Sequence, residues 1–209
     1  MIWERWWGKE SDGTTTDSSG SFSFRNLLDP SFTNLLDEHT IVAIKVMGDK
    51  YLTHWEHRQV KDKEGEDLTL SIEINARPKI PNVVITKNQI ILKKPIHFVP
   101  TGAVYDAGTI NSDSYALLEE IADILNKNPK IKKIEIQGHT DNTGDPEHNM
   151  QLSQSRADSV KAWLESHGVD GGRLGAKGYG QTRPIVPNVT AVNRATNRRI
   201  LLVIMEQDK

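Results

Sequence analysis

A polar loop, GHTDNTGD, is followed by a segment in which one arginine lies among apolar residues. The loop supplies Asp141 and Asp145, and the segment supplies Arg156. A carboxylate can bind an ammonium group, and a planar guanidinium can bind a carboxylate through two hydrogen bonds. Together these side chains could bind a zwitterionic amino-acid head group. The alternative is an internal ion pair between Asp141 and Arg156 with no ligand, and the residue types leave both readings open.

A helix over residues 146–167 must position the arginine. Asp145 is a capping carboxylate followed by Pro146 in the first turn, and Gly168 ends the helix. The loop before it follows a strand end, which is a common place for ligands in α/β sheets.

Arg156 is expected on the apolar side of that helix. Leu152 and Val160 lie four residues before and after it, and residues at this spacing share one face. A lone buried guanidinium is costly. Arg156 therefore requires a carboxylate, from Asp141, from Asp145 or from a ligand.

Strand and helix patterns alternate through the C-terminal part of the chain. Strands are predicted at 83–92, 95–99, 131–137, 173–179 and 198–205, and helices at 114–127, at 146–167 and, as a short helix, from Thr190. The order β/α/β/α/β predicts an α+β sandwich, in which a mixed sheet carries its helices on one face.

The first eighty residues differ in composition. Three parts are predicted: a Trp-rich N-terminus and flexible linker at 1–21, a small β-rich module at 22–80, and the α+β domain at 83–205. Within the module, a hairpin is predicted from 40–47 and 51–60, and a half-buried strand at 67–75. Its role does not follow from the sequence.

Trp3, Trp6 and Trp7 crowd the N-terminus and could contact a protein partner or a membrane interface, or pack on their own domain. The segment MIWERWWGKE lacks the apolar core of a secretory signal. We therefore expect that a periplasmic chain has lost a signal or uses another route. No apolar run of 18 residues is present, so no transmembrane segment is expected.

The charge balance and cysteine content exclude several functions. The net charge is -2 and the chain has no cysteine. Residues 1–80 hold ten Lys and Arg against fourteen Asp and Glu, and residues 81–209 hold sixteen against fourteen. This spread argues against nucleic-acid binding. Disulfides, thiolate chemistry and Cys-based zinc sites are excluded.

Metal and catalytic motifs were weighed in the same way. Asp141, Thr143 and Asp145 begin like a calcium loop, but Pro146 replaces the required glycine and Leu152 the final glutamate. In the segment His54-Trp55-Glu56-His57 the two histidines would face opposite sides of a strand. His139 has no nucleophile beside it and is expected to be a satisfied structural histidine. Trp163 is expected to serve packing. No metal, cofactor or catalytic residue is predicted.

Residues 134–160, IEIQGHTDNTGDPEHNMQLSQSRADSV, resemble the signature G-H-T-D-x-x-G…N-x-x-L-S-x-x-R-A-x-x-V of the OmpA-like peptidoglycan-binding family. The resemblance covers residues 89–205 and continues through Gly178-Tyr179-Gly180 and Asn197-Arg198-Arg199. The lipoprotein Pal, OmpA-type porins and MotB-like stators carry this domain.

The resemblance implies non-catalytic binding of peptidoglycan in the periplasm or cell envelope. The implied ligand is the diaminopimelate of the stem peptide, with Asp141 on its amino group and Arg156 on its carboxylate. The family positions that line the groove correspond to Thr143, Asn149 and Leu152. The segment after Phe98 would form the opposite wall, but it departs from the Pal pattern and its residues stay unassigned.

Three further family positions were considered. Arg194 and Arg198 match family arginines and are expected mainly in buried or sheet-end pairs, with a role in the site as the less favoured alternative. Asn193 stands where many members have glycine, which is a structural difference.

Two other functions remain as alternatives. A peptidoglycan hydrolase would need a nucleophile or metal cluster that the domain lacks. An assembly protein would use the domain as an anchor, while residues 22–80 and the Trp-rich end dock onto an envelope complex, a stator or a phage-tail-like particle.

Overall fold

The computed structural model describes residues 41–46, 50–59, 72, 74–100 and 108–208. Its elements are β1 (Ile41–Val46), β2 (His54–Gln59), β3 (Val83–Ile85), β4 (Gln89–Leu92), α1 (Tyr115–Lys127), β5 (Ile131–His139), α2 (Pro146–Ser166), β6 (Leu174–Gly178), α3 (Ala191–Asn197) and β7 (Arg199–Gln207), with 3-10 turns η2 (Ser112–Ser114) and η3 (Gly171–Arg173). The chain divides into two compact units, and the main sheet, its helices and the candidate site lie in the unit of residues 43–58 and 69–209.

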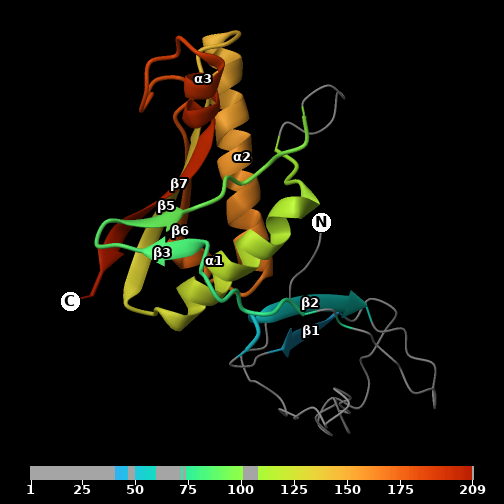
Figure 1. Cartoon of the computed structure of the whole chain (residues 1–209). Helices are drawn as coiled ribbons and strands as arrows, with labels where there is room; N and C mark the ends of the chain where they lie inside the picture. Colours follow the sequence, from blue (N-terminus) through green and yellow to red (C-terminus); the bar gives the residue numbers. More distant parts are fainter. Residues whose placement is uncertain (1–40, 47–49, 60–71, 73, 101–107, 209) are drawn as a thin grey trace, which may run out of the picture. The chain divides into compact units, whose positions relative to one another are not determined.

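Five strands form the main sheet in the order β3-β4-β7-β5-β6. The pair β5–β6 is parallel, while β3–β4, β4–β7 and β5–β7 are antiparallel. Figure 1 shows α1 and α2 on the same side of this sheet. The predicted α+β fold, a mixed sheet with helices on one face, is therefore confirmed.

The core lies between the sheet and these two helices. On β5, Ile134 and Ile136 are fully buried, two positions apart as a strand requires. On α1, Leu118, Ile121 and Leu125 are buried at helical spacing. Each such side chain contributes roughly 1.5–3 kcal/mol when it leaves water. The apolar periodicity of the sequence thus corresponds to the observed core.

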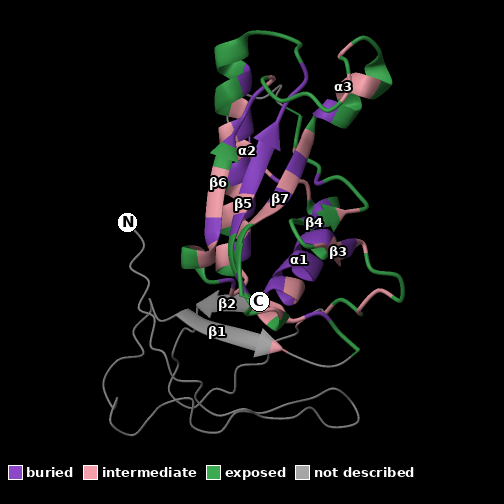
Figure 2. Cartoon of the chain, turned by 90° about the vertical axis from the view of Figure 1, so that its left-hand side faces the viewer, coloured by how far each residue is buried: buried purple, intermediate pink, exposed green. Residues whose placement is uncertain are grey.

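Two glycines bring α2 against the sheet. A Cβ at Gly138 of β5 would lie 2.1 Å from the backbone oxygen of Ser153, and one at Gly178 of β6 would lie 2.5 Å from the backbone nitrogen of Gln154. Only glycine allows this approach of helix and strand backbones. Figure 2 shows the buried end of β5 beside α2. The contact places the N-terminus of α2 next to the end of β5.

Two strand predictions require correction. Residues 83–92 form β3 and β4 rather than one strand, because the Thr86 amide donates to the Gln89 carbonyl at 2.9 Å and turns the chain. Residues 95–99 form no strand. Phe98 makes a single bridge to Ile110, and the prolines at both ends of the segment restrict its pairing.

The N-terminal β-rich region is described in part. β1 pairs with β2 in a two-stranded sheet, which confirms the predicted hairpin. The strand predicted at 67–75 lies largely outside the described residues, as do the tryptophans of the N-terminus. The boundary near residue 80 stays a prediction.

Residues 50–55 and 75–83, which we term the strap, lie against α1. The two segments pair with each other, since the Leu52 amide donates to Asn75 and the Arg77 amide to Lys50. At the C-terminal end of α2, a Cβ on Gly168 would meet the Trp55 indole at 2.3 Å. The strap is therefore packed onto the same unit as the sheet.

Three buried carboxylates of α1 hold the strap. Asp123, fully buried, accepts hydrogen bonds from the Arg77 guanidinium at 2.6 and 3.2 Å and from Thr53. Glu119 accepts from Asn75 at 2.6 Å, and Glu120 from the Asn82 and Val83 amides. Burial opposes ionisation of Asp123, but the hydrogen bonds from Arg77 and Thr53 outweigh it and lower its pKa.

Candidate functional site

The predicted site begins in the loop between β5 and α2. Gly144 has φ of 87°, a value that favours glycine, and it turns the chain toward the helix. Asp145 then caps α2, because its carboxylate accepts the His148 amide at 2.8 Å. The helix start inferred from Asp145 and Pro146 is confirmed. Asp141 precedes the turn and is buried.

Both carboxylate oxygens of Asp141 are hydrogen bonded. One accepts the Thr143 amide at 2.8 Å, and the other accepts the Arg198 guanidinium at 2.5 Å. Burial opposes ionisation, but the Arg198 and Thr143 hydrogen bonds outweigh it, so the pKa of Asp141 lies below its ordinary value. The Asp141 side chain is 9% exposed and that of Arg198 is 48% exposed. The pair thus has a buried anion and a cation at the surface.

Arg156 is not paired with Asp141, so the internal ion pair that the sequence left open is not formed. Within the described residues its guanidinium makes no hydrogen bond or ion pair, and its buried Nε has no acceptor. It lies over the Phe98 ring, 5.0 Å from the centroid. Burial, and then the positive charge of Arg198, lower the pKa of Arg156. The two guanidinium groups are therefore close enough to repel each other.

Asn149 holds the loop in place. Its side-chain amide donates to the Thr143 carbonyl at 3.0 Å, to the Gln181 side chain at 3.0 Å and, more weakly, to the Asp141 carbonyl at 3.4 Å. The residue is buried, whereas Thr143 is exposed. Asn149 thus fixes the shape of the loop, and Thr143 faces solvent at its rim.

The apolar stripe of α2 is displaced from the prediction. Its buried residues are Asn149, Ser153, Ala157, Val160 and Leu164. Leu152 and Arg156 lie beside this line and are only partly buried. The glycines of the sheet explain the shift, because they admit the small side chains of α2 and turn its larger ones aside.

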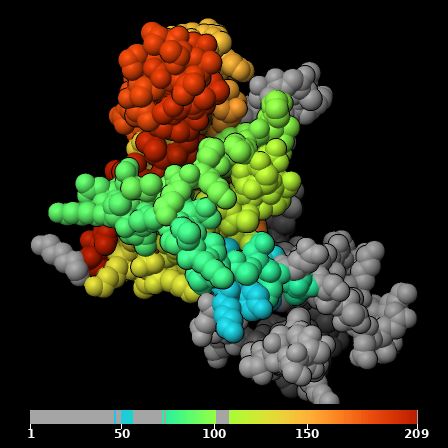
Figure 3. Space-filling view, in the orientation of Figure 1, coloured from blue at the N-terminus to red at the C-terminus, as the bar shows by residue number. Residues whose placement is uncertain are grey.

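Arg198 makes a contact with the predicted site that the sequence did not lead us to favour. A sheet-end pair was expected, and its partner is the site carboxylate itself. The signal lies in the topology, because β7 is antiparallel to β5 with His139 opposite Arg199. The start of β7 therefore meets the end of β5. In Figure 3, α3 and the loop before it form one raised mass, coloured orange-red, at this end of the unit.

The other family arginine has a local role. Arg194 donates to the backbone carbonyls of Asn188 at 3.2 Å and Val189 at 3.4 Å. It holds the loop before α3.

His139 is buried but not satisfied, which corrects the expectation. Its ring stacks on Tyr179 with centroids 5.4 Å apart, and the Arg183 guanidinium lies 3.9 Å from the Tyr179 centroid. Neither ring nitrogen has a hydrogen-bond partner among the described residues. Burial, and then the charges of Arg199 and Arg183, lower its pKa to about 4. His139 is thus neutral and serves packing.

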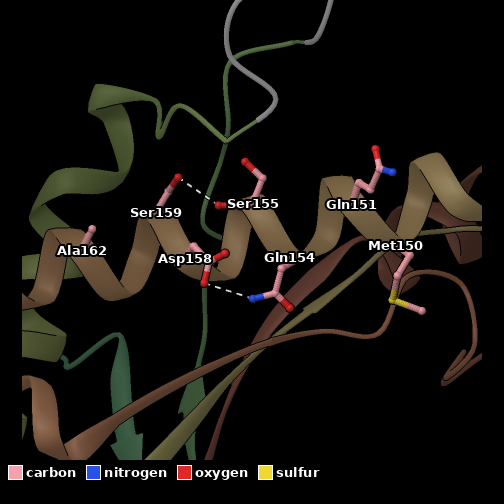
Figure 4. Close-up of a pocket in the computed structure, with 7 residues that line it drawn as sticks. All are labelled: Met150, Gln151, Gln154, Ser155, Asp158, Ser159 and Ala162. Atoms are coloured by element: carbon pink, nitrogen blue, oxygen red, sulfur yellow. Dashed lines mark hydrogen bonds between the residues drawn. The ribbon is translucent and has the colours of Figure 1, made fainter.

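A separate hollow lies along α2 (Figure 4), lined by Met150, Gln151, Gln154, Ser155, Asp158, Ser159 and Ala162. The Gln154 amide donates to Asp158 at 3.0 Å, and the Ser159 hydroxyl donates to the Ser155 carbonyl at 3.0 Å. Its lining includes neither Asp141 nor Arg156. Asp158 is the one charged side chain among these lining residues, and the hollow therefore offers no cation for a carboxylate.

Metal and membrane features were sought in the described ranges. No group of three His, Asp or Glu is placed to hold a metal ion there. His54 instead faces Glu119, with Nδ1 3.3 Å from its carboxylate. Among the described helices, none is long and apolar enough to cross a membrane. Trp163 stacks on His167 with centroids 3.4 Å apart and also packs against the core.

Comparison with known proteins found matches to the C-terminal half. The OmpA family model matches residues 105–198. Outer membrane porin F of Pseudomonas aeruginosa is 39% identical over 97 residues, which are 46% of this chain and 27% of that protein. The peptidoglycan-associated lipoprotein of Haemophilus influenzae is 38% identical over 98 residues, which are 47% of this chain and 63% of that protein.

A solved structure gave a similar match. The periplasmic domain of MotB from Helicobacter pylori aligns with 30% identity and a TM-score of 0.49, over 61% of this chain and 82% of that one. The chain thus spans less than two thirds of either curated relative.

Proposed function

We propose that this chain, whose residues 105–198 match the OmpA family model, binds peptidoglycan without cleaving it and anchors its N-terminal residues to the cell wall. The proposed ligand group is the diaminopimelate head group of the stem peptide. The name of the H. influenzae relative states an association with peptidoglycan, and the proposed location is the cell envelope.

The observation that carries the proposal is the unpaired guanidinium of Arg156. Asp141, Arg156 and Arg198 form a group with one negative and two positive charges. A partly buried guanidinium without an anion is unfavourable, so a ligand carboxylate beside Arg156 would relieve it. Asp141 offers the matching acceptor for an ammonium group. A zwitterionic head group fits both.

The surrounding chain favours an anionic ligand. Between Asp170 and Glu206 the sequence has six Lys and Arg and no Asp or Glu. The start of α2 adds the partial positive charge of a helix N-terminus. Thr143 at the rim and Leu152 beside Arg156 are proposed to contact the ligand, and Asn149 to keep the loop in shape.

A sacculus pull-down tests the proposal. Wild type should sediment with diaminopimelate-type sacculi, and Asp141→Ala and Arg156→Ala should be lost to the supernatant. Lys132→Ala is a matched control, because Lys132 pairs with Asp208 and lies outside the site. If folded Asp141→Ala and Arg156→Ala bind as wild type does, the site assignment is wrong.

The same sacculi separate binding from hydrolysis. We expect their turbidity to stay constant after addition of the protein, since the site offers charge pairing and no activated nucleophile. A steady loss of turbidity that Arg156→Ala abolishes would overturn the non-catalytic proposal.

A further inference from the structure

Arg198 already occupies the acidic side of the site. Its guanidinium donates to the Asp141 carboxylate, on the oxygen that Thr143 leaves free. An ammonium group of a ligand would have to take this place. Asp141 is therefore not an open acceptor, because an internal cation holds it.

The Arg198 guanidinium is also positioned so that a ligand could displace it from Asp141. Its side chain is half-exposed, so solvent reaches it while Asp141 stays buried. Because one partner of this ion pair is half in water, its exchange for another cation costs less than it would in a fully buried pair. Its charge also acts on Arg156, so a carboxylate beside Arg156 lies within the field of both guanidinium groups.

We propose that Arg198 determines the specificity of the site: it holds the ammonium position on Asp141, and yields it only to a ligand whose carboxylate pairs with the displaced guanidinium. This inference rests on the proposed function and adds to it a reason for selectivity.

The charge balance gives the expected order of ligands. A head group with ammonium and carboxylate replaces Arg198 on Asp141 and supplies an anion for Arg156 and Arg198. A head group with ammonium alone also displaces Arg198, but it leaves two guanidinium groups without an anion. Such a ligand should be rejected. Lysine in place of diaminopimelate is this case, and so is diaminopimelate with an amidated side-chain carboxylate.

Three synthetic stem peptides test the inference. They differ in one residue only, which is diaminopimelate, side-chain-amidated diaminopimelate or lysine. Calorimetry with the full chain measures the affinity of each peptide for wild type and for Arg198→Gln. Arg194→Gln is the control, because it removes the same charge from α3 without touching Asp141.

Wild type should prefer the diaminopimelate peptide. Arg198→Gln should bind the lysine and amidated peptides more tightly than wild type does, and should reduce the preference by about tenfold or more, the equivalent of one charged hydrogen bond. Arg194→Gln should retain the wild-type order. Equal weakening of all three peptides by Arg198→Gln, or no change in any, would overturn the inference.

A second variant covers the case in which Arg198→Gln does not fold. Arg198→Lys keeps a cation on Asp141 and should still reject the lysine peptide, but it should bind diaminopimelate less tightly because the bidentate donor is lost. Tight binding of lysine by this variant would contradict the inference. If wild type binds no diaminopimelate peptide, the proposed function fails, and the role of Arg198 fails with it.

Discussion

The carboxylates of α1 and the guanidinium groups around Asp141 are both charged groups withdrawn from water. On α1, Asp123 is fully buried, and the Arg77 fork, Thr53 and Lys127 satisfy it. Beside the end of β5, Arg156 is partly buried, and its Nε has no acceptor in the described part of the chain. His139, at the end of β5, also has no hydrogen-bond partner among the described residues, but its ring is neutral.

The difference separates two uses of buried charge. A fully buried carboxylate that accepts from Arg77 and Thr53 holds two parts of the fold together and is out of reach of a ligand. A cation without an anion costs stability, and it persists where binding supplies the missing partner. The α1 cluster therefore holds the strap, whereas the Asp141 cluster is the one that we propose binds a ligand.

Replacing Asp123 by Ala should have the largest effect on the free energy of unfolding. The change leaves Arg77 and Thr53 without their acceptor, which should cost about 3 kcal/mol. Urea unfolding at neutral pH measures it. Asp158→Ala, on the exposed side of α2, should cost less than about 0.5 kcal/mol. Similar losses for the two variants would contradict the contrast.

His139→Phe should change how stability depends on pH. The folded pKa is about 4, below the ordinary 6.5, so folding favours neutral histidine. Its contribution is complete above pH 6.5 and is lost as the pH falls toward 4, where the unfolded chain takes up a proton first. As the pH falls across this window, the free energy of unfolding should decrease by roughly 2–3 kcal/mol more in wild type than in His139→Phe. Parallel stability curves would refute the assignment.

Asp141→Asn should have a smaller effect. Its partner Arg198 is half in water, so the loss at neutral pH should be about 1 kcal/mol. Because the folded pKa of Asp141 is lowered, its contribution is present above about pH 3.9 and disappears as the pH falls below that value. Unfolding of both proteins at pH 7 and pH 3 measures this. If the difference in unfolding free energy between wild type and Asp141→Asn is larger at pH 3 than at pH 7, another group controls this pH dependence.

Arg156→Met should leave stability nearly unchanged, within about 1 kcal/mol and with a gain permitted, because it removes an unpaired charge and keeps apolar contact with Phe98. The same variant should no longer bind sacculi. Arg77→Met is the matched comparison. It should destabilise the fold, because Asp123 loses the two hydrogen bonds from the Arg77 guanidinium. A large loss from Arg156→Met alone would mean that Arg156 is structural.

Much of this architecture could be predicted from local pattern. The N-terminal caps of α2 and α3 could be predicted from residue type, and Asp145 and Thr190 each accept the backbone amide three residues further along the chain. The sequence also indicates that residues 83–92 form two strands, because the polar residues Thr86, Lys87 and Asn88 interrupt the apolar run.

The partners of the charged groups could not be predicted in this way. Helix periodicity placed Arg156 toward the interior but could not show that Asp141 pairs with Arg198, because that contact depends on the pairing of β7 with β5. Arg198 reaches Asp141 only because these strands, distant in the chain, end together. The burial of the α1 carboxylates could not be predicted for the same reason, because Arg77, the ion-pair partner of Asp123, lies far from it in the sequence.

The strap also determines where force would enter this unit. Trp55 packs on Gly168 at one end of α2, and the Asp141 loop lies at the other. The helix has 21 residues, a length of about 31 Å at 1.5 Å per residue. Tension on residues 50–55 would therefore enter this unit about one helix length from the Asp141 loop, through the hydrogen bonds and ion pair that hold the strap to α1.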